Sequence, residues 1–440
     1  MPRSTANSNR AQHCGAEAHH LSRRSFLGTV GMGTAGVAAN MGVIETLTSP
    51  VFADELKRNQ KSVVLLWLAG GASQLETWDP KPGVETGGPY SAIQTDISGV
   101  RISELMPKMS QRLSQHTAII RSLNTKIADH GGGYQLMDTG RRPEPGVDFP
   151  HLGAMIAHEL AQQDSKVPDH IEMYTSTEGR RKGTAGFLPA RYNPMFLTDS
   201  MMPENISRLD SISDADHKQR ADFRAMLAQQ FNHGLNSPSV SSHNSAFERV
   251  RGLMSSDYLF DVEKEPQSMR DHYGPTQFGE QCLIARRLVE AGVPFVKVAR
   301  AWWDSHGQNF ETHRELCADL DHVMSALLDD LQQRGLLDTT LVITLGEFGR
   351  TPRINGSLGR DHFASAWSCS LSGCGIKPGT VYGKTDDLGN TVVEGEANAG
   401  NLFATIFTAL GIDPEKEYML GSRPVPMADF HCPPIAEVLS

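Results

Sequence analysis

The chain has 440 residues, of which 39% are hydrophobic and 7% aromatic, and its formal net charge is -10 at pH 7. This length is sufficient for one large α/β domain or for two ordinary domains. The acidic balance argues against a nucleic-acid partner and against binding to an anionic membrane surface. No segment after the N-terminal leader approaches the apolar length that a bilayer requires, so we expect no stable membrane span in the mature chain.

Residues 1–53 have the features of a twin-arginine signal peptide. Arg23 and Arg24 precede a glycine- and alanine-rich, mildly apolar segment, and Val51-Phe-Ala53 fits a small-x-small cleavage site. A basic cytoplasmic tail would need neither the apolar segment nor the cleavage site. We therefore expect the twin-arginine export machinery as a partner and a periplasmic or extracellular location.

Five cysteines remain after the leader, and their odd number and irregular spacing do not form a disulfide framework. Cys369 and Cys374 are close enough in sequence either to pair or to remain free thiols. No CxxC or HExxH pattern occurs, so the spacing excludes a zinc ribbon and a zincin.

The mature domain, residues 54–440, begins with alternating strand and helix patterns. Apolar runs predict strands, and residues recurring every three or four positions predict helices. In chain order these are a strand at 61–69, a helix at 103–113, a strand at 117–121, a helix starting at 134–137 and ending at Gly140, and a helix at 151–163. Residues 164–275 are richer in Ser, Asn, Asp and Met, with weak helices at 215–230 and 245–254, and we interpret them as a helical or irregular insertion covering the site.

The regular pattern returns after the insertion. A helix ending at Gly292 leads to a strand at 293–299, and a capping box at Thr312 to Glu315 predicts the start of a long helix that ends at Gly335. A strand at 341–345 follows. Strand, helix and strand in this order give parallel strands whose carboxyl ends meet at one edge of the sheet, where ligands bind in such folds.

Four candidate metal ligands follow these two strands. They are Asp304 and His306 after the first strand, and Glu347 and His362 after the second. Imidazole and carboxylate groups together suit zinc, manganese or iron, and the fold brings distant loops to the same edge. The alternative is that Asp304 and His362 cap loops by hydrogen bonds.

Three further residues are candidates for catalysis. His130 precedes three glycines at the start of a predicted helix, and it is interpreted as a nucleophile, a general base or a ligand. Arg350 and Arg360 could bind a sulfate or phosphate ester through their guanidinium forks, or could form ion pairs with neighbouring acids. Trp302 and Trp303 could stack on a sugar face or belong to the core or its rim.

The twin-arginine leader and four motifs together resemble an exported family of unknown function, number 1501 (DUF1501), which is grouped with the alkaline-phosphatase and sulfatase superfamily. The motifs are the loop at 70–82, Trp303-Asp-Ser-His306, Gly346-Glu-Phe-Gly-Arg-Thr-Pro352 and Gly359-Arg-Asp-His-Phe363. The resemblance implies a doubly wound, mainly parallel α/β sheet of alkaline-phosphatase type.

Motif by motif, the resemblance also shows departures. Glu347-Phe348 stands where the superfamily has Asp-His, so the acid is kept in type and the histidine is lost. Gly70 and Gly71 stand where active relatives have a metal-binding Asp, whereas His362 fits a downstream metal or substrate histidine. Counting back from Thr139 and Gly140 places His130 at the nucleophile position. These departures imply at most one cation.

The expectation from the sequence is an exported, metal-dependent hydrolase of sulfate or phosphate esters, acting on an anionic small molecule or a polysaccharide. The cofactor would be a divalent ion such as zinc, manganese, iron or calcium. The alternative is a non-catalytic relative that binds sulfated glycans or a secreted partner.

Overall fold

The computed structural model describes residues 60–440, apart from 163–164, 166, 177–181, 199–200, 204–210, 233–251, 253, 255 and 430. The twin-arginine leader expected at 1–53 lies outside these residues, as does most of the helix expected at 245–254. The description below concerns the unit Lys57–Ser440.

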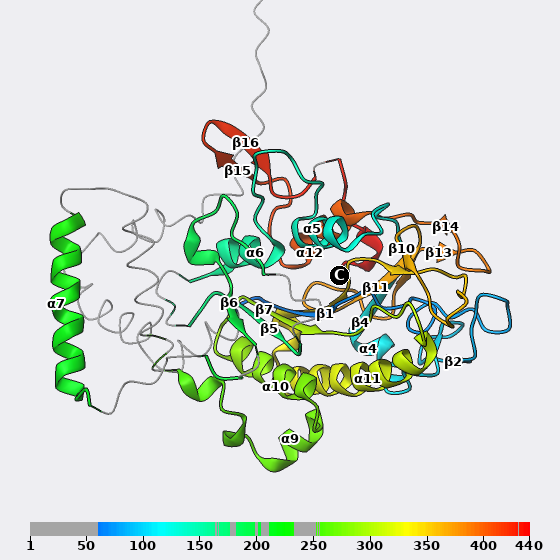
Figure 1. Cartoon of the computed structure of the whole chain (residues 1–440), viewed down its shortest axis with the longest axis horizontal. Coiled ribbons are helices and arrows are strands. Elements are labelled where there is room, and N and C mark those ends of the chain that lie inside the picture. The colour runs from blue at the N-terminus through cyan, green and yellow to red at the C-terminus, as the bar shows by residue number, and fades with distance from the viewer. Residues whose placement is uncertain are drawn as a thin grey trace, which may run out of the picture. The chain divides into compact units, whose positions relative to one another are not determined.

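An eight-stranded sheet forms the centre of this unit (Figure 1). In spatial order its strands are β12 (Val381–Tyr382), β4 (Thr117–Leu123), β11 (Trp367–Gly373), β8 (Thr340–Leu345), β1 (Ser62–Leu68), β7 (Phe295–Arg300), β5 (His170–Tyr174) and β6 (Met195–Leu197). All neighbours are parallel except β11, which runs antiparallel to both β4 and β8. The predicted mainly parallel α/β sheet is therefore confirmed.

β1 is the central strand of the fold because it pairs with β7 on one side and β8 on the other. Every residue of β1 is buried. Its side chains alternate between two cores: Val63, Leu65 and Trp67 enter one, and Val64 and Leu66 enter the other. A strand buried on both faces reads as a continuous apolar run, which is why it was recognisable in the sequence.

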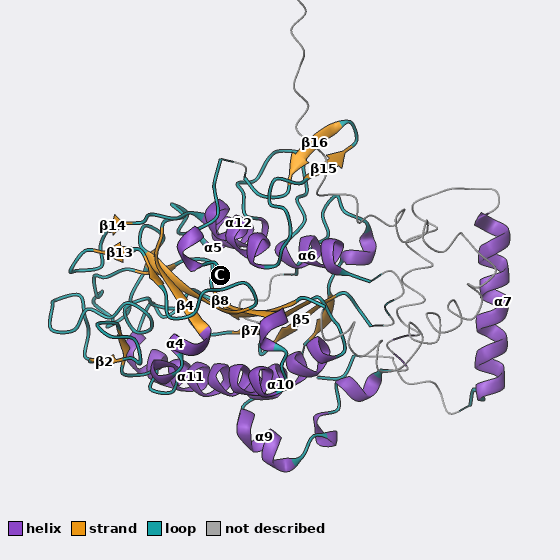
Figure 2. Ribbon diagram, turned by 180° about the vertical axis from the view of Figure 1, so that it is seen from behind, coloured by secondary structure: helices purple, strands orange, loops and turns teal. Residues whose placement is uncertain are grey.

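Helices cover both faces of the sheet (Figure 2). On one side lie α5 (His130–Thr139), α6 (Leu152–Leu160) and α12 (Ala399–Ala409), and on the other lie α10 (Gln277–Glu290) and α11 (Asn309–Gln333). The remaining helices are α4 (Leu113–His116), α7 (Asp214–Asn232) and α9 (Gln267–Tyr273), with short 3-10 helices at Met109–Gln111, Ala190–Tyr192, Asp257–Leu259, Val262–Lys264, Leu337–Thr339 and Ala436–Val438. None of the helices in the described part of the chain combines the length and apolar character needed to cross a bilayer.

Short antiparallel strand pairs lie outside the eight-stranded sheet. They are β2 (Ala92–Gln94) with β3 (Arg101–Ser103), β9 (Gly349–Arg350) with β10 (His362–Phe363), β13 (Lys384–Thr385) with β14 (Val392–Glu394), and β15 (Glu417–Leu420) with β16 (Arg423–Pro426). The β9–β10 pair places His362 opposite Arg350.

Several predicted boundaries were wrong. The helix expected at 103–113 is replaced by the 3-10 turn at Met109–Gln111 and the single turn α4. α11 begins at Asn309, one turn before the predicted capping box, after Gln308 in a left-handed conformation. α5 begins at His130 itself, where Asp129 caps it by accepting a hydrogen bond from the Gly132 amide.

The segment 164–275 is only partly the insertion that its composition suggested. α7 matches the predicted helix at 215–230. However, β5 and β6 from the same segment extend the central sheet beyond β7. β5 was missed because its buried side chains include His170 and Glu172, which interrupt the apolar pattern of a central strand.

Candidate metal centre

The candidate site lies at the carboxyl edge of the central strands. β1 ends in Gly70 and Gly71, β7 leads into Asp304, and β8 leads into Glu347. His130 reaches the same place from the start of α5, which follows β4. The predicted convergence of loops that are distant in sequence is therefore confirmed, at the edge where open α/β sheets bind ligands.

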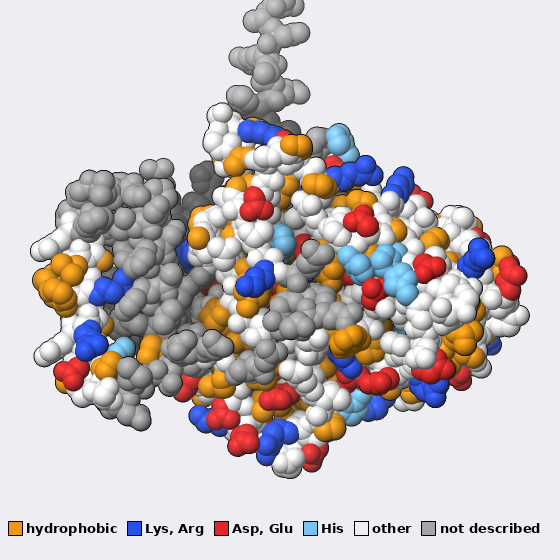
Figure 3. Space-filling view, in the orientation of Figure 1, with side chains coloured by type: hydrophobic (Ala, Val, Ile, Leu, Met, Phe, Trp, Pro, Cys, Tyr) orange, Lys and Arg blue, Asp and Glu red, His pale blue; other side chains and the backbone are white. Residues whose placement is uncertain are grey.

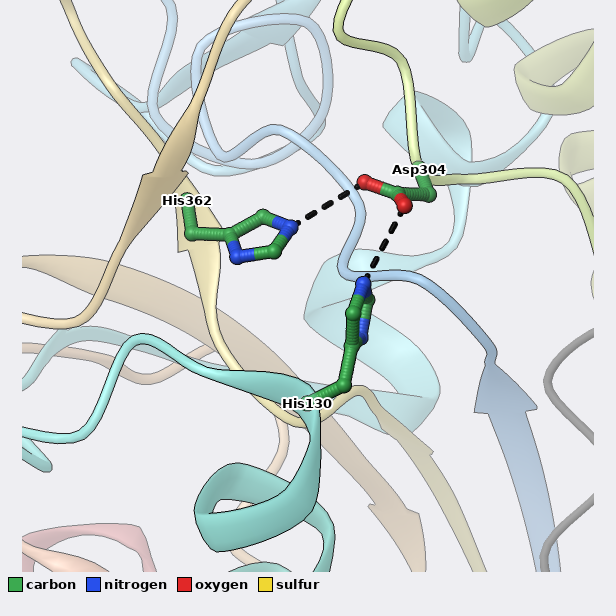
Figure 4. Close-up of side chains that lie close together, drawn as sticks. All are labelled: His130, Asp304 and His362. Atoms are coloured by element: carbon green, nitrogen blue, oxygen red, sulfur yellow. Dashed lines mark hydrogen bonds and ion pairs between the residues drawn. The ribbon is translucent and has the colours of Figure 1, made fainter.

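Three histidines meet at the carboxylate of Asp304 (Figure 4 shows two of them). His130 Nε2 lies 3.1 Å from Asp304 Oδ2. His306 Nε2 and His362 Nε2 lie 3.1 and 3.2 Å from Oδ1 of the same carboxylate. These two imidazole nitrogens are 3.0 Å from each other. One carboxylate thus gathers the Nε2 atoms of three imidazoles.

The other nitrogen of each imidazole has an oxygen partner. His130 Nδ1 is 2.9 Å from Glu347 Oε1, and His306 Nδ1 is 2.8 Å from Asp361 Oδ1. His362 Nδ1 donates to the Ala128 carbonyl at 2.9 Å. A carbonyl only accepts, so neutral His362 carries its proton on Nδ1 and a lone pair on Nε2. In the neutral state with Nδ1–H, all three histidines direct Nε2 lone pairs at the Asp304 carboxylate.

These residues fit a bound cation. The Nε2 lone pairs and the Asp304 carboxylate repel one another at these distances unless positive charge lies between them. In addition, a histidine that binds a metal through one nitrogen typically donates the N–H of its other nitrogen to an oxygen, as the Nδ1 atoms do here. Donors that share one tetrahedral zinc ion are about 3.3 Å apart, close to the 3.0 to 3.2 Å found here. His130, Asp304 and His362 offer ligand atoms within 4.8 Å of one another.

Glu347 supports the site from beneath. Its side chain is fully buried, and Oε1 accepts hydrogen bonds from His130 and from the Gly70 amide at 2.9 Å. Oε2 is buried without a hydrogen-bond partner. Glu347 and His306 were both expected as ligands, but the possible ligand group consists of His130, Asp304 and His362. Glu347 holds His130 in place, and His306 lies beside the group, with its Nε2 3.0 Å from that of His362. The unpaired oxygen also adds negative potential, which favours a cation.

The electrostatics match this arrangement. The hydrogen bond to Glu347 raises the pKa of His130 above its usual value, with burial opposing the shift and Asp304 adding to it. Burial alone would raise the pKa of Asp304, but the charge and the hydrogen bond of Arg350, together with the neighbouring histidines, outweigh burial and lower that pKa strongly. Asp304 is therefore ionised at neutral pH.

Gly70, Gly71 and Phe348 explain the departures from the superfamily motifs. A Cβ atom on Gly70 would lie 2.4 Å from the Asp304 amide nitrogen, and one on Gly71 would lie 2.7 Å from the Phe348 carbonyl oxygen. No side chain can therefore occupy the position of a first metal-binding Asp. Phe348 is fully buried, and its ring packs 4.3 Å from that of His362 and 5.2 Å from that of His130. Phe348 therefore restricts the imidazole rings of His130 and His362 and is not itself a metal ligand.

The roles expected for Arg350 and Arg360 need correction. Both guanidinium groups are completely buried. Arg350 donates to Asp304 Oδ1 at 2.6 Å and to the carbonyls of Gly70 and Gly71. Arg360 binds Glu76, which is equally buried, at 2.7 Å. Their donors are directed at protein oxygens, so they position loops and do not reach toward a substrate anion.

The glycines after His130 have a packing role. A Cβ atom on Gly132 would lie 2.7 Å from Ile127, and one on Gly133 would lie 3.1 Å from Phe348. The Gly132 amide is occupied by the Asp129 side chain. Gly132 and Gly133 thus let α5 pack closely against Ile127 and against the loop that follows β8, so that His130 meets Glu347.

The centre is open to solvent on one side. The side chains of His130, His306 and Asp304 are partly exposed, whereas Glu347 beneath them is not. Histidine side chains gather beside acidic ones on the surface near β10 and α5 (Figure 3). Two outer partners, Asp361 and the Ala128 carbonyl, were missed in the sequence. Asp361 directly precedes His362, and this Asp-His pair was the available signal.

The fold and the site together define an α/β protein with a candidate cation centre formed by His130, Asp304 and His362, with His306 beside it. Its sequence matches the family "Protein of unknown function (DUF1501)" over residues 60–439, and the chain belongs to that family. No curated protein matches the sequence.

Solved structures with some similarity include three enzymes by title. A sulfatase from Pseudoalteromonas sp. has a TM-score of 0.38 and 11% identity, covering 82% of this chain and 69% of that one. The lipoteichoic acid synthase of Listeria monocytogenes has a TM-score of 0.38 and 8% identity, covering 85% and 76%. The phosphonate monoester hydrolase of Agrobacterium radiobacter has a TM-score of 0.35 and 10% identity, covering 86% and 77%. Similarities at this level carry no argument about the reaction of this chain.

Proposed function

We propose that the protein is a metal-dependent hydrolase of sulfate or phosphate esters, with one divalent cation held by His130, His306, His362 and Asp304. The observation that carries this proposal is the convergence of three Nε2 atoms on Asp304, at 3.1 to 3.2 Å, while each Nδ1 is anchored by an oxygen. Imidazole with carboxylate suits zinc, iron or manganese better than calcium.

A divalent cation bound there would supply Lewis-acid polarisation of an ester oxygen and a lowered pKa for a coordinated water. The protein groups have supporting roles. Arg350 holds the Asp304 carboxylate, Glu347 holds the His130 ring, and Phe348 restricts the rings of His130 and His362. Of the three roles considered for His130, that of ligand fits best, because both of its nitrogens already face carboxylates.

The test is hydrolysis by the full-length protein of a panel of aryl sulfates and aryl phosphates, before and after chelation. We expect turnover of at least one class, loss of turnover on chelation, and recovery when a single metal is restored. His306→Ala should lower kcat/KM by roughly 100-fold or more. His116→Ala, which changes a histidine at the end of α4 outside the site, should leave it unchanged. Turnover that is insensitive to both chelation and His306→Ala would refute the proposal.

The inward orientation of Arg350 and Arg360 favours a second candidate function, a non-catalytic module that binds sulfated glycans through the bound cation. It predicts no turnover across the ester panel, together with glycan binding that chelation abolishes. Turnover of any ester in the panel at a rate sensitive to His306→Ala would exclude it.

We further propose export of the folded protein through the twin-arginine pathway, supported by the leader at residues 1–53. Replacing Arg23 and Arg24 together by Lys should retain the chain, uncleaved, in the cytoplasmic fraction. Replacing Arg3 and Arg10 by Lys is the matched control and should leave export unchanged. Equal export of both variants would contradict this route.

A further inference from the structure

Trp302 differs from every other tryptophan of the chain. Its side chain is 55% exposed, whereas Trp67, Trp78, Trp303 and Trp367 are each at most 1% exposed. The residues on either side of it, Ala301 and Trp303, are buried. The largest side chain of this turn is therefore the one directed to solvent.

The backbone of Trp302 is also unfavourable. Its φ angle is +79°, in the left-handed region that bulky residues avoid. Within the described part of the chain, four non-glycine residues have positive φ: Lys126, Trp302, Gln308 and Leu358. All four lie on the loops that carry the candidate ligands, before His130, around Asp304 and His306, or before His362. Strained backbone that gathers at one site is typical of functional positions.

No interaction within the protein compensates for these two features. Over the residues that the structure describes, the Trp302 indole has neither a hydrogen bond nor a ring contact. The left-handed backbone at Trp302 is instead stabilised by hydrogen bonds of the residues that follow it. The Trp303 amide donates to the Ala69 carbonyl at 3.1 Å, and the Ser305 amide donates to the Trp303 carbonyl at 2.9 Å. These bonds fix the turn on the end of β1 and leave the indole face available to a ligand.

Trp302 is close enough to the candidate cation to contact the same substrate. A single residue, Trp303, lies between Trp302 and Asp304, so their Cα atoms are at most about 7.6 Å apart. The exposed groups on the loops around His306 include the polar residues Gln308, Ser357 and Asp361, beside the exposed apolar side chain of Leu358. A flat apolar surface surrounded by hydrogen-bonding groups suits a hydroxylated ring better than a purely aromatic one.

We propose that Trp302 is a stacking surface for a pyranose ring, so that the ligand of this centre is a sulfated or phosphorylated carbohydrate. The inference rests on the proposed function, because it assigns the substrate class of the same site. The C–H face of the sugar would lie on the indole, its hydroxyl groups would meet the polar loop residues, and its ester group would point to the cation centre.

Trp302 itself reports on this contact, because it is the exposed tryptophan among five. The experiment measures acrylamide quenching of tryptophan fluorescence in the full-length protein, with chelator present to prevent turnover and again with metal. The probes are carrageenan and chondroitin sulfate hexasaccharides, with p-nitrophenyl sulfate as the non-carbohydrate ester. At saturating hexasaccharide we expect the quenching constant of the metal-loaded protein to fall about twofold, with little change from p-nitrophenyl sulfate.

Variants complete the test. Trp302→Ala should weaken hexasaccharide binding roughly tenfold and Trp302→Phe should recover part of it, while Val393→Ala, at an equally exposed apolar position on β14, should have no effect. An unchanged quenching constant with both hexasaccharides, or a decrease with p-nitrophenyl sulfate alone, would overturn the assignment. The two proposals can fail separately. If the hexasaccharides protect Trp302 from acrylamide but no ester is hydrolysed, only the proposed hydrolase activity is contradicted. If esters are hydrolysed but Trp302 is not protected, only the proposed stacking surface is contradicted.

Discussion

Asp304 is the residue on which the site depends. One of its oxygens faces His306, His362 and Arg350, and the other faces His130. The buried guanidinium of Arg350 stabilises the carboxylate from behind, whereas the three imidazoles approach it from the side of solvent. A carboxylate held in this way is preorganised as a metal ligand, since little rearrangement is needed for a cation to bind.

Gly70 gives a residue-scale prediction. Gly70→Ala places a Cβ atom 2.4 Å from the backbone nitrogen of Asp304, at a φ of +106°. Because neither backbone can move without disturbing the sheet, we expect a loss of more than about 3 kcal/mol in the free energy of unfolding. Denaturant unfolding measures it.

Gly83→Ala is the matched control. Gly83 also has a positive φ of +79°, but no atom lies within 4 Å of its added Cβ. Only the left-handed backbone is then penalised, by about 1 kcal/mol. Equal losses for the two variants would show that the Asp304 loop does not pack against Gly70 as described.

Arg360 and Glu76 give a second prediction at this scale. Both side chains are completely buried and joined by hydrogen bonds of 2.7 to 3.2 Å. Arg360→Met leaves a buried carboxylate without its partner, and we expect a loss of about 3 to 5 kcal/mol in stability. Adding Glu76→Leu should restore part of the loss, which a double-mutant cycle detects. A variant with unchanged stability and a raised KM would instead support the original role of Arg360 on the substrate anion.

At the scale of elements, β5, β7 and α5 share a buried polar network. Glu172 on β5 pairs in register with Lys297 on β7 and accepts a hydrogen bond from Tyr174 at 2.7 Å. Lys297 in turn contacts Asp138 on α5 at 3.2 Å and lies over the ring of Trp67. The network connects β5, the neighbour of the edge strand β6, to the helix that begins with His130.

This network predicts a dependence of stability on pH. Burial opposes ionisation of Glu172, but Lys297 and His170 outweigh it and lower its pKa from 4.5 to about 2. The unfolded chain therefore binds a proton at higher pH than the folded chain does. The stabilisation, about 3 kcal/mol, should be fully present above about pH 5 and be lost as the pH falls from about 4.5 toward 2.

Unfolding free energies of the wild type and Glu172→Gln measure this effect across that pH range. The wild type should be the more stable protein at pH 7, and its advantage should shrink as the solution is acidified. A difference that stays constant between about pH 7 and 3 would contradict the assignment of the proton to Glu172.

At the scale of the whole molecule, the sequence predicted the elements that bury one continuous apolar surface. β1, β7 and β8 were recognisable as apolar runs, and the order strand, helix, strand placed Asp304, His306 and His362 at one edge. β5 was not recognisable, because its polar residues are satisfied by one another and by the Tyr192 carbonyl and the Gly183 amide, which lie outside the strand.

Side-chain direction was the other limit. Arg350 and Arg360 belong to a charged segment that the sequence suggests is exposed, yet both turn inward, Arg350 to the partly buried Asp304 and Arg360 to the fully buried Glu76. Likewise, the exchange of roles between His130 and Glu347 depends on how closely α5 approaches the loop after β8. Gly132 and Gly133 allow this approach, but the sequence alone does not show it. The residue types were sufficient to predict a cation site, whereas the packing of the loops determines which residues are candidate ligands and which residues support them.

The most direct test of the account is metal binding by the full-length protein as it is exported. Elemental analysis and titration should find about one equivalent of a divalent transition metal, and X-ray absorption should show nitrogen and oxygen ligands at about 2.0 to 2.2 Å. His362→Ala should lower the affinity by roughly 10-fold to 100-fold or more, while His116→Ala should not. Less than about 0.1 equivalent of any metal, with no uptake on titration, would contradict the claim that three histidines and Asp304 form a cation centre.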